Sequence, residues 1–144
     1  MNQFVRYLFE SIGHMEFFEK KGMPEKGIAH VAAAFGYSMA GLGVLLREEA
    51  ARLEVVMFLV ATLLFAVSGA AFLNYAVMVA ILLFVLALEA VNTAIELIID
   101  RTSPERSDYA KQAKDLGSFA VFCGLTLFVG YVSWVMLSLW TELI

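Results

Sequence analysis

Two long uncharged stretches dominate the pattern of hydrophobic and polar positions along the chain. Residues 55–88 carry no charged side chain, and neither do residues 116–141. Because a helix needs about 20 apolar residues to cross a bilayer core, the second stretch is long enough for one span. The first stretch continues into the mostly apolar residues 89–99 and is long enough for two, with a break at 68–74, where its only glycine and only asparagine lie. The pattern predicts three transmembrane helices over about 53–69, 75–99 and 116–141.

The first 52 residues have a different character, because residues 1–18 mix aromatic with charged side chains and residues 47–52 are again rich in charge. Residues 28–52 favour a helix rich in small residues, and we expect it to lie in the membrane interface as an amphipathic surface helix. Residues 1–27 form an N-terminal extension, which either lies in the interface as well or is a loosely ordered tail. The predicted fold class is all-α, with one three-span domain over 28–144.

The composition excludes several classes of protein. Apolar residues make up 61% of the chain and charged residues only 17%, whereas a soluble globular enzyme of this size needs a more polar surface. The single cysteine excludes a disulfide scaffold. The net charge of −4 argues against a nucleic-acid partner, which would require a basic surface.

The basic residues predict an orientation in the membrane. All ten lysines and arginines lie outside the predicted spans, six within the first 52 residues and four between 100 and 115. Since basic loops remain on the cytoplasmic side, we expect the N-terminus and the 100–115 loop to be cytoplasmic and the C-terminus to lie outside.

The second predicted span carries polar residues where they are costly. Glu89, Asn92 and Glu96 recur at spacings of three and four and therefore share one helix face. A charge at the bilayer centre costs about 2.5–3.5 kcal/mol, so these side chains should face a protein interior, water or a cation. One interpretation is hydrogen bonding between helices. The other is a magnesium–nucleotide site at the inner face, because Mg²⁺ prefers oxygen ligands and a nearby lysine is a natural phosphate partner. The usual phosphate-loop, dinucleotide and kinase motifs are missing.

Three segments together form a long and specific motif. Residues 89–96 read E-x-x-N-x-x-I-E, residues 100–101 read D-R, and residues 113–118 read A-K-D-x-G-S. This motif resembles that of the prokaryotic diacylglycerol kinase family, and the resemblance extends from residue 34 to the end of the chain. It implies a three-span homotrimer with an amphipathic surface helix and with active sites shared between subunits. It also implies an enzyme of the bacterial cytoplasmic (inner) membrane, which transfers the γ-phosphoryl group of Mg-ATP to the hydroxyl of diacylglycerol.

The resemblance also implies roles for individual residues. Glu89 would be the general base, and Glu96 would hold Mg²⁺ together with a glutamate of the 48–54 segment. Residues expected at or near the ATP are Tyr37, Ser38, Asn92, Lys114 and Asp115. Residues expected at the lipid substrate are Arg52, Glu54 and Ser118.

One segment departs from the family pattern, which usually reads E-x-A-F-R-x-E before the first span. Here Ala51 stands where phenylalanine is expected, and the spacing back to residues 36–38 is one residue short. Glu48 fits the register to Glu54, whereas Glu49 fits the spacing from residues 36–38, and we favour Glu48 as the metal ligand. Undecaprenol kinase shares the motifs and is the alternative enzyme. The alternative of another class is a small non-enzymatic membrane oligomer, such as a channel or a scaffold.

Overall fold

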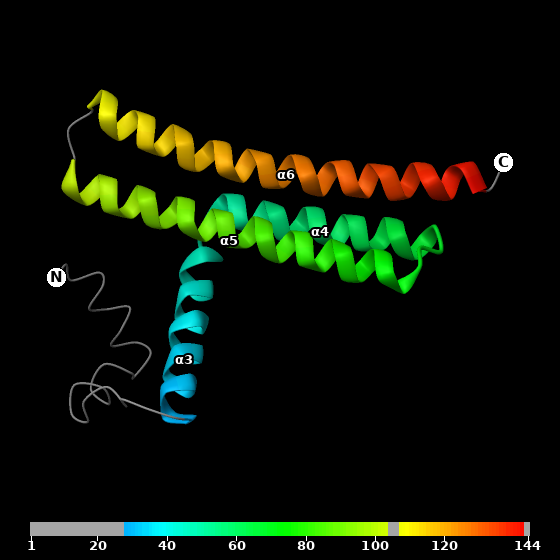
Figure 1. Cartoon of the computed structure of the whole chain (residues 1–144), viewed down its shortest axis with the longest axis horizontal. Helices are drawn as coiled ribbons and strands as arrows, with labels where there is room; N and C mark the ends of the chain where they lie inside the picture. The colour runs from blue at the N-terminus through cyan, green and yellow to red at the C-terminus, as the bar shows by residue number, and fades with distance from the viewer. Residues whose placement is uncertain (1–27, 104–106, 143–144) are drawn as a thin grey trace. The chain divides into compact units, whose positions relative to one another are not determined.

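The computed structural model describes residues 28–103 and 107–142, and within these residues the chain is all-helical. Four helices follow one another: α3 (Ile28–Leu45), α4 (Glu49–Val67), α5 (Phe72–Thr102) and α6 (Asp108–Glu142) (Figure 1). The prediction of an all-α fold is confirmed. The predicted N-terminal extension, 1–27, lies outside the described residues.

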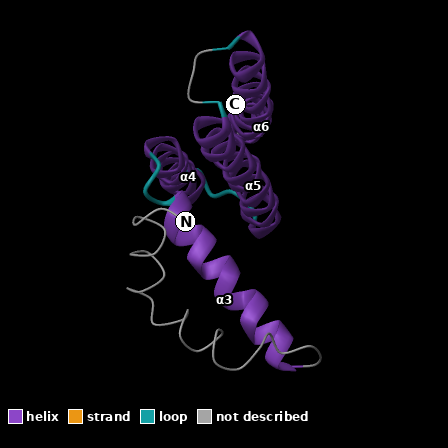
Figure 2. Cartoon of the chain, turned by 90° about the vertical axis from the view of Figure 1, so that its left-hand side faces the viewer, coloured by secondary structure: helices purple, strands orange, loops and turns teal. Residues whose placement is uncertain are grey.

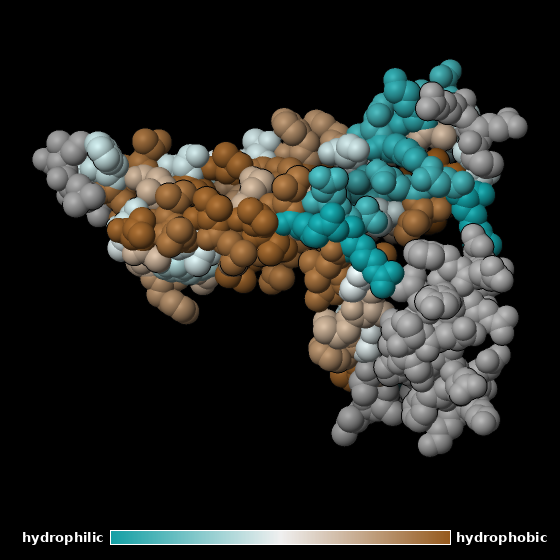
Figure 3. Space-filling model, turned by 180° about the vertical axis from the view of Figure 1, so that it is seen from behind, coloured by the Kyte–Doolittle hydropathy of each residue, from teal (hydrophilic) through white to brown (hydrophobic). Residues whose placement is uncertain are grey.

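Three of these helices are long and apolar enough to cross a membrane, which confirms the predicted number of spans. They are Glu49–Val67, Phe72–Thr102 and Asp108–Thr141. Each helix is longer than the corresponding predicted span, 53–69, 75–99 or 116–141. The surface of these helices is largely hydrophobic, and hydrophilic surface gathers toward the end that carries the α5–α6 connection (Figure 3).

The chain divides into two compact units, Met1–Leu42 and Gly43–Ile144, which are described separately. In the first unit, α3 exposes apolar side chains at spacings of four, four and three, namely Val31, Phe35, Met39 and Leu42. These spacings place the four side chains on one face of the helix.

The boundary between α3 and α4 differs from the predicted one. The predicted surface helix ran to residue 52, but α3 ends at Leu45, and the backbone turns through N–H to carbonyl bonds from Arg47 to Val44 and from Glu48 to Leu45. Glu48 is the extended N-cap residue of α4, with φ −69° and ψ 137°. The segment contains neither glycine nor proline, so the sequence carried no breaker that could have located this turn.

The α4–α5 turn lies where the sequence predicted it. Gly69 adopts a left-handed φ of +71°, and the N–H of Ala70 donates to the carbonyl of Phe65 over 3.0 Å. This is the bond pattern that commonly ends a helix at a glycine.

In the second unit, α5 and α6 run antiparallel and make most of the helix–helix contacts, while α4 packs mainly on α5. Figure 2, which looks toward the end with the α5–α6 connection, shows α4, α5 and α6 side by side. The buried positions of α6 recur every seven residues at Val121, Phe128 and Val135. Such a repeat is typical of helices packed nearly parallel to one another's axes.

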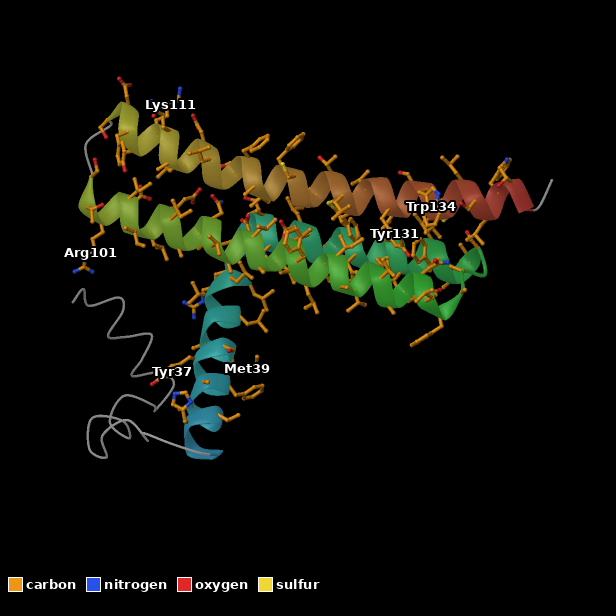
Figure 4. The ribbon with its side chains drawn as sticks, in the orientation of Figure 1. Tyr37, Met39, Arg101, Lys111, Tyr131 and Trp134 are labelled. Carbon is orange, nitrogen blue, oxygen red and sulfur yellow. The ribbon has the colours of Figure 1, made fainter. Side chains whose placement is uncertain are left out.

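The core of this unit is closed at the α4–α5 turn by aromatic rings. Phe65 is fully buried and contacts Tyr75 edge-on, with ring centroids 5.6 Å apart, and Tyr131 at 6.4 Å. The Tyr131 hydroxyl donates to the Asn74 carbonyl over 3.2 Å. We call Phe65, Tyr75 and Tyr131 the aromatic cluster; Figure 4 labels Tyr131 on α6, well away from Lys111 near the start of that helix.

Candidate active site

Four buried polar side chains lie in the second unit, away from the aromatic cluster. Glu54 of α4 is 4% exposed, and α5 contributes Glu89 (5%), Asn92 (8%) and Thr93 (8%). We call these four residues the polar cluster. Ionisable groups this deeply buried are rare in any protein and are expected at functional sites within membrane helices.

Carboxylates from two helices converge on Glu89. The charges of Glu96 and Glu48 act on the Glu89 carboxylate, and the charge of Glu89 acts on Glu54. Asn92, one turn along α5, is a hydrogen-bond partner of Glu89. The face predicted from the spacing of residues 89, 92 and 96 therefore lies toward the neighbouring helices, with Glu89 near Glu54 of α4 and Asn92 against Gly117 of α6.

The two alternative metal ligands occupy different places at the start of α4. Glu48 is the N-cap residue, and Glu49 is the first helical residue; both side chains are exposed. Of the two, it is Glu48 whose charge acts on Glu89. This proximity supports Glu48 as the residue that shares a site with Glu89 and Glu96.

Several polar atoms of the cluster are unpaired. Both carboxylate oxygens of Glu54 and the amide oxygen of Asn92 are buried and have no hydrogen-bond partner in the described part of the chain. An unsatisfied buried polar atom costs about 1–3 kcal/mol, so proteins retain such atoms mainly where they are used.

The motif residues of α6 lie beside the end of α5. The Lys114 ammonium pairs with the Asp100 carboxylate over 2.5 Å, and both side chains are partly exposed. Asp115 and Ser118 are exposed. Asp100 belongs to the recognised motif, but the sequence assigned it no role; the structure makes it the partner of the predicted ATP-binding lysine.

The remaining predicted residues make local contacts. The Arg52 guanidinium donates to the carbonyl of Arg47 over 2.6 Å. Tyr37 and Ser38 belong to α3 in the first unit, where the Ser38 hydroxyl donates to the Ala34 carbonyl. The structure thus brings Glu48, Glu54, Glu89, Asn92 and Glu96 together within one unit.

Sequence reasoning missed the burial of Thr93. It follows Asn92 on α5 and is 8% exposed. The sequence did contain a signal for this burial, because Thr93 is a polar residue next to the face formed by Glu89, Asn92 and Glu96.

Among the described residues, no group of three or more histidine, cysteine, aspartate or glutamate side chains is arranged to hold a metal ion. A magnesium ion that also binds ATP phosphates needs only one or two carboxylates, so Glu48 and Glu96 form a chemically suitable pair of ligands.

An apolar groove begins about one helical turn from Glu54. It has a volume of about 270 Å³ and lies between α4, which contributes Val56, Met57 and Val60, and α6, which contributes Val129 and Val132. A groove of this composition suits a hydrocarbon chain.

Comparison with known proteins places the chain in a family. Residues 36–137 match the family model described as prokaryotic diacylglycerol kinase. A diacylglycerol kinase of Sinorhizobium sp. is 43% identical over 78% of this chain and 82% of its own length. A diacylglycerol kinase of Pseudomonas aeruginosa is 39% identical over 80% of this chain and 93% of its own length. One of Escherichia coli K12 is 30% identical over 81% of this chain and 93% of its own length. The chain therefore belongs to the prokaryotic diacylglycerol kinase family, and this membership supports a lipid kinase embedded in a membrane.

Proposed function

We propose that this protein is an ATP-dependent diacylglycerol kinase, which converts diacylglycerol to phosphatidic acid at the cytoplasmic face of the bacterial inner membrane. The observation that carries the proposal is the buried Glu89 carboxylate, surrounded by Glu48, Glu54, Asn92 and Glu96 in a chain of this family. A buried carboxylate beside a hydroxyl substrate is suited to general-base catalysis.

In the proposed reaction, Glu89 removes the proton from the lipid hydroxyl. The hydroxyl oxygen forms a bond to the γ-phosphorus of ATP, the bond between that phosphorus and the β–γ bridging oxygen breaks, and ADP leaves. The proton remains on the Glu89 carboxyl until it passes to solvent. Because phosphoryl transfer depends mainly on positioning and charge neutralisation, one base with well-placed cations is sufficient. Asn92 orients Glu89 through their hydrogen bond.

The charged residues around Glu89 are suited to the nucleotide. Glu48 and Glu96 would hold Mg²⁺, which neutralises phosphate charge when bound. The Lys114 ammonium would pair with a phosphate, and Asp115 would contact the nucleotide beside it. By the family motif, Tyr37 and Ser38 would also contact the nucleotide.

The lipid would enter from the apolar side of the polar cluster. Its acyl chain fits the groove between α4 and α6, which leads away from Glu54. Glu54, Arg52 and the exposed Ser118 would contact the head group. An acceptor held in this way presents its hydroxyl at the level of Glu89, where the base is buried.

The proposal includes an arrangement in the membrane. The domain 28–144 would span the membrane three times with a cytoplasmic N-terminus and an outer C-terminus, and residues 1–27 would be an extension. The apolar face of α3 supports a surface helix in the interface. The active form would be a homotrimer with sites shared between subunits, as the resemblance to the family implies.

The test is a kinase assay on the purified protein in mixed micelles, with diacylglycerol and undecaprenol side by side. We expect ATP-dependent phosphorylation of diacylglycerol that requires Mg²⁺ and is stopped by chelation. Phosphorylation of undecaprenol alone would show that the alternative enzyme is correct, and phosphorylation of neither lipid would contradict the proposal.

Glu89→Gln tests the base directly. The amide keeps the size of the side chain but cannot accept the hydroxyl proton, so the turnover number should fall by about 100- to 10,000-fold. Asp108→Asn, at an exposed carboxylate at the start of α6, is the matched control. Helicity and oligomer size in detergent should be unchanged in both variants. Near-normal turnover of Glu89→Gln would show that another group is the base.

A further inference from the structure

The amide oxygen of Asn92 occupies space that a side chain at position 117 would need. Gly117 lies on α6 within the recognised motif and is buried against α5. A methyl group at Gly117 would overlap the Asn92 amide oxygen and would lie 3.3 Å from the Asn92 Cγ and 3.7 Å from its Cα. The Cα distance is an ordinary van der Waals contact, whereas the overlap with the amide oxygen means that an added methyl group must displace the Asn92 amide.

Asn92 has two ends with different partners. It interacts with the Glu89 carboxylate, for which its amide N–H is the available donor, while its amide oxygen is buried without a hydrogen-bond partner. The oxygen is therefore held in place by packing against Gly117 rather than by a hydrogen bond. A displaced oxygen turns the whole planar amide, because both ends rotate together.

We infer that Gly117 is a positioning residue for Glu89, acting through Asn92. The missing side chain lets α6 approach α5 closely enough to fix the Asn92 amide with its N–H toward Glu89. This inference rests on the proposed function, because it takes Glu89 to be the base.

The same helix supplies two matched controls. A methyl group at Gly124, seven residues further on, would meet the apolar side chains of Leu88, at 3.0 Å, and Val85, at 3.3 Å, and the Val85 Cα at 3.7 Å, but no polar atom among its nearest neighbours. A methyl group at Gly130 would meet nothing within 4 Å in the described part of the chain. The effect of Gly124→Ala therefore measures crowding of the α5–α6 interface. The effect of Gly130→Ala measures only the change in helix propensity from glycine to alanine.

The experiment measures turnover on diacylglycerol and thermal unfolding in detergent for Gly117→Ala, Gly124→Ala and Gly130→Ala. Gly117→Ala should lower kcat by about tenfold or more, with the KM for ATP and for lipid within about twofold of the parent. Gly124→Ala should lower the unfolding midpoint but keep kcat per folded enzyme within about twofold. Gly130→Ala should leave kcat unchanged and raise the midpoint slightly, because alanine favours a helix over glycine. An equal kcat for Gly117→Ala and Gly124→Ala would overturn the inference.

A double-mutant cycle with Asn92→Ser tests the route through Asn92. The shorter side chain makes room, so Gly117→Ala in that background should cost less than about twofold in kcat and should lower the midpoint less than it does in the parent. Gly124→Ala should lower the midpoint equally in both backgrounds. If Asn92→Ser is itself inactive, the midpoints alone decide the coupling. Additive effects of the Gly117 and Asn92 changes would overturn the inference, whereas retained activity of Glu89→Gln would refute the proposed base instead.

Discussion

The aromatic cluster and the polar cluster lie in the same three-helix unit but differ in whether their buried polar atoms have hydrogen-bond partners. In the aromatic cluster, Phe65 is fully buried between two tyrosine rings, and the Tyr131 hydroxyl has an acceptor in Asn74. In the polar cluster, the Glu54 carboxylate and the Asn92 amide oxygen are buried and unpaired. The comparison indicates that the first region stabilises the helices, while the second holds buried polar atoms that oppose folding, around the carboxylate that we propose as the base.

The difference has a physical basis in the surroundings of each cluster. Helices in a bilayer associate through packing and hydrogen bonds, because lipid is as apolar as their own side chains. Rings that fit together therefore stabilise the unit, whereas unpaired oxygens oppose its assembly. Substitutions in the two clusters should consequently separate stability from activity.

The largest effect on stability is expected from Phe65→Ala. Removing a fully buried ring leaves a cavity and abolishes the contacts with Tyr75 and Tyr131, which should lower the free energy of unfolding by about 3–5 kcal/mol. Turnover per folded molecule should change little, since the ring lies outside the polar cluster. Phe72→Ala is the control, because that ring is 86% exposed at the start of α5. Equal destabilisation by the two changes would argue against the aromatic cluster as the stabilising region.

The opposite outcome is expected from Glu54→Leu. This change replaces two buried, unpaired oxygens by a similar apolar volume and should raise the free energy of unfolding by about 1–3 kcal/mol. It should at the same time reduce turnover, because Glu54 faces Glu89. Glu54→Gln, which keeps buried polar atoms, should give no such gain in stability. Loss of stability in Glu54→Leu would show that the carboxylate has a structural partner.

The helices were largely predictable because their signal is local. A run of uncharged residues predicts a span. The only glycine of residues 55–88 predicts the turn at Gly69. The helix ends were not predictable, because the helices continue beyond their apolar residues. For example, α6 begins at Asp108, within a polar segment, rather than at residue 116, where the predicted span begins. Hydropathy reports where a membrane can be crossed and not where backbone hydrogen bonding stops.

The site was predictable only along a single helix. The spacing of Glu89, Asn92 and Glu96 on α5 gave their shared face, and the family motif supplied the expected roles. The burial of Glu54 and the fit of Gly117 against Asn92 depend on how α4 and α6 pack on α5. Such contacts join residues that are far apart in the sequence, and periodicity carries no information about them.

A smaller effect is expected where α6 meets the end of α5. Lys114→Met removes the proposed phosphate partner and should lower kcat/KM for ATP by about tenfold, or about 1.4 kcal/mol. The stability of the protein should hardly change, because the pair with Asp100 is partly exposed and such pairs contribute little. Asp100→Asn removes the pair but keeps the lysine and should impair ATP use less. An equal loss in both variants would mean that the pair acts as a structural link between the helices.

The smallest effect should come from Tyr131→Phe, which removes one hydroxyl and leaves the ring contacts with Phe65 in place. The lost bond to the Asn74 carbonyl should lower the free energy of unfolding by about 0.6 kcal/mol, as is usual for hydrogen bonds between membrane helices. Turnover should be unchanged, because the hydroxyl lies at the α4–α5 turn, away from Glu89. Tyr109→Phe, at a ring that is 82% exposed, is the control for removing a phenolic hydroxyl from α6. If Tyr131→Phe reduced turnover without changing stability, the two clusters would be coupled, and the separation of roles between them would be wrong.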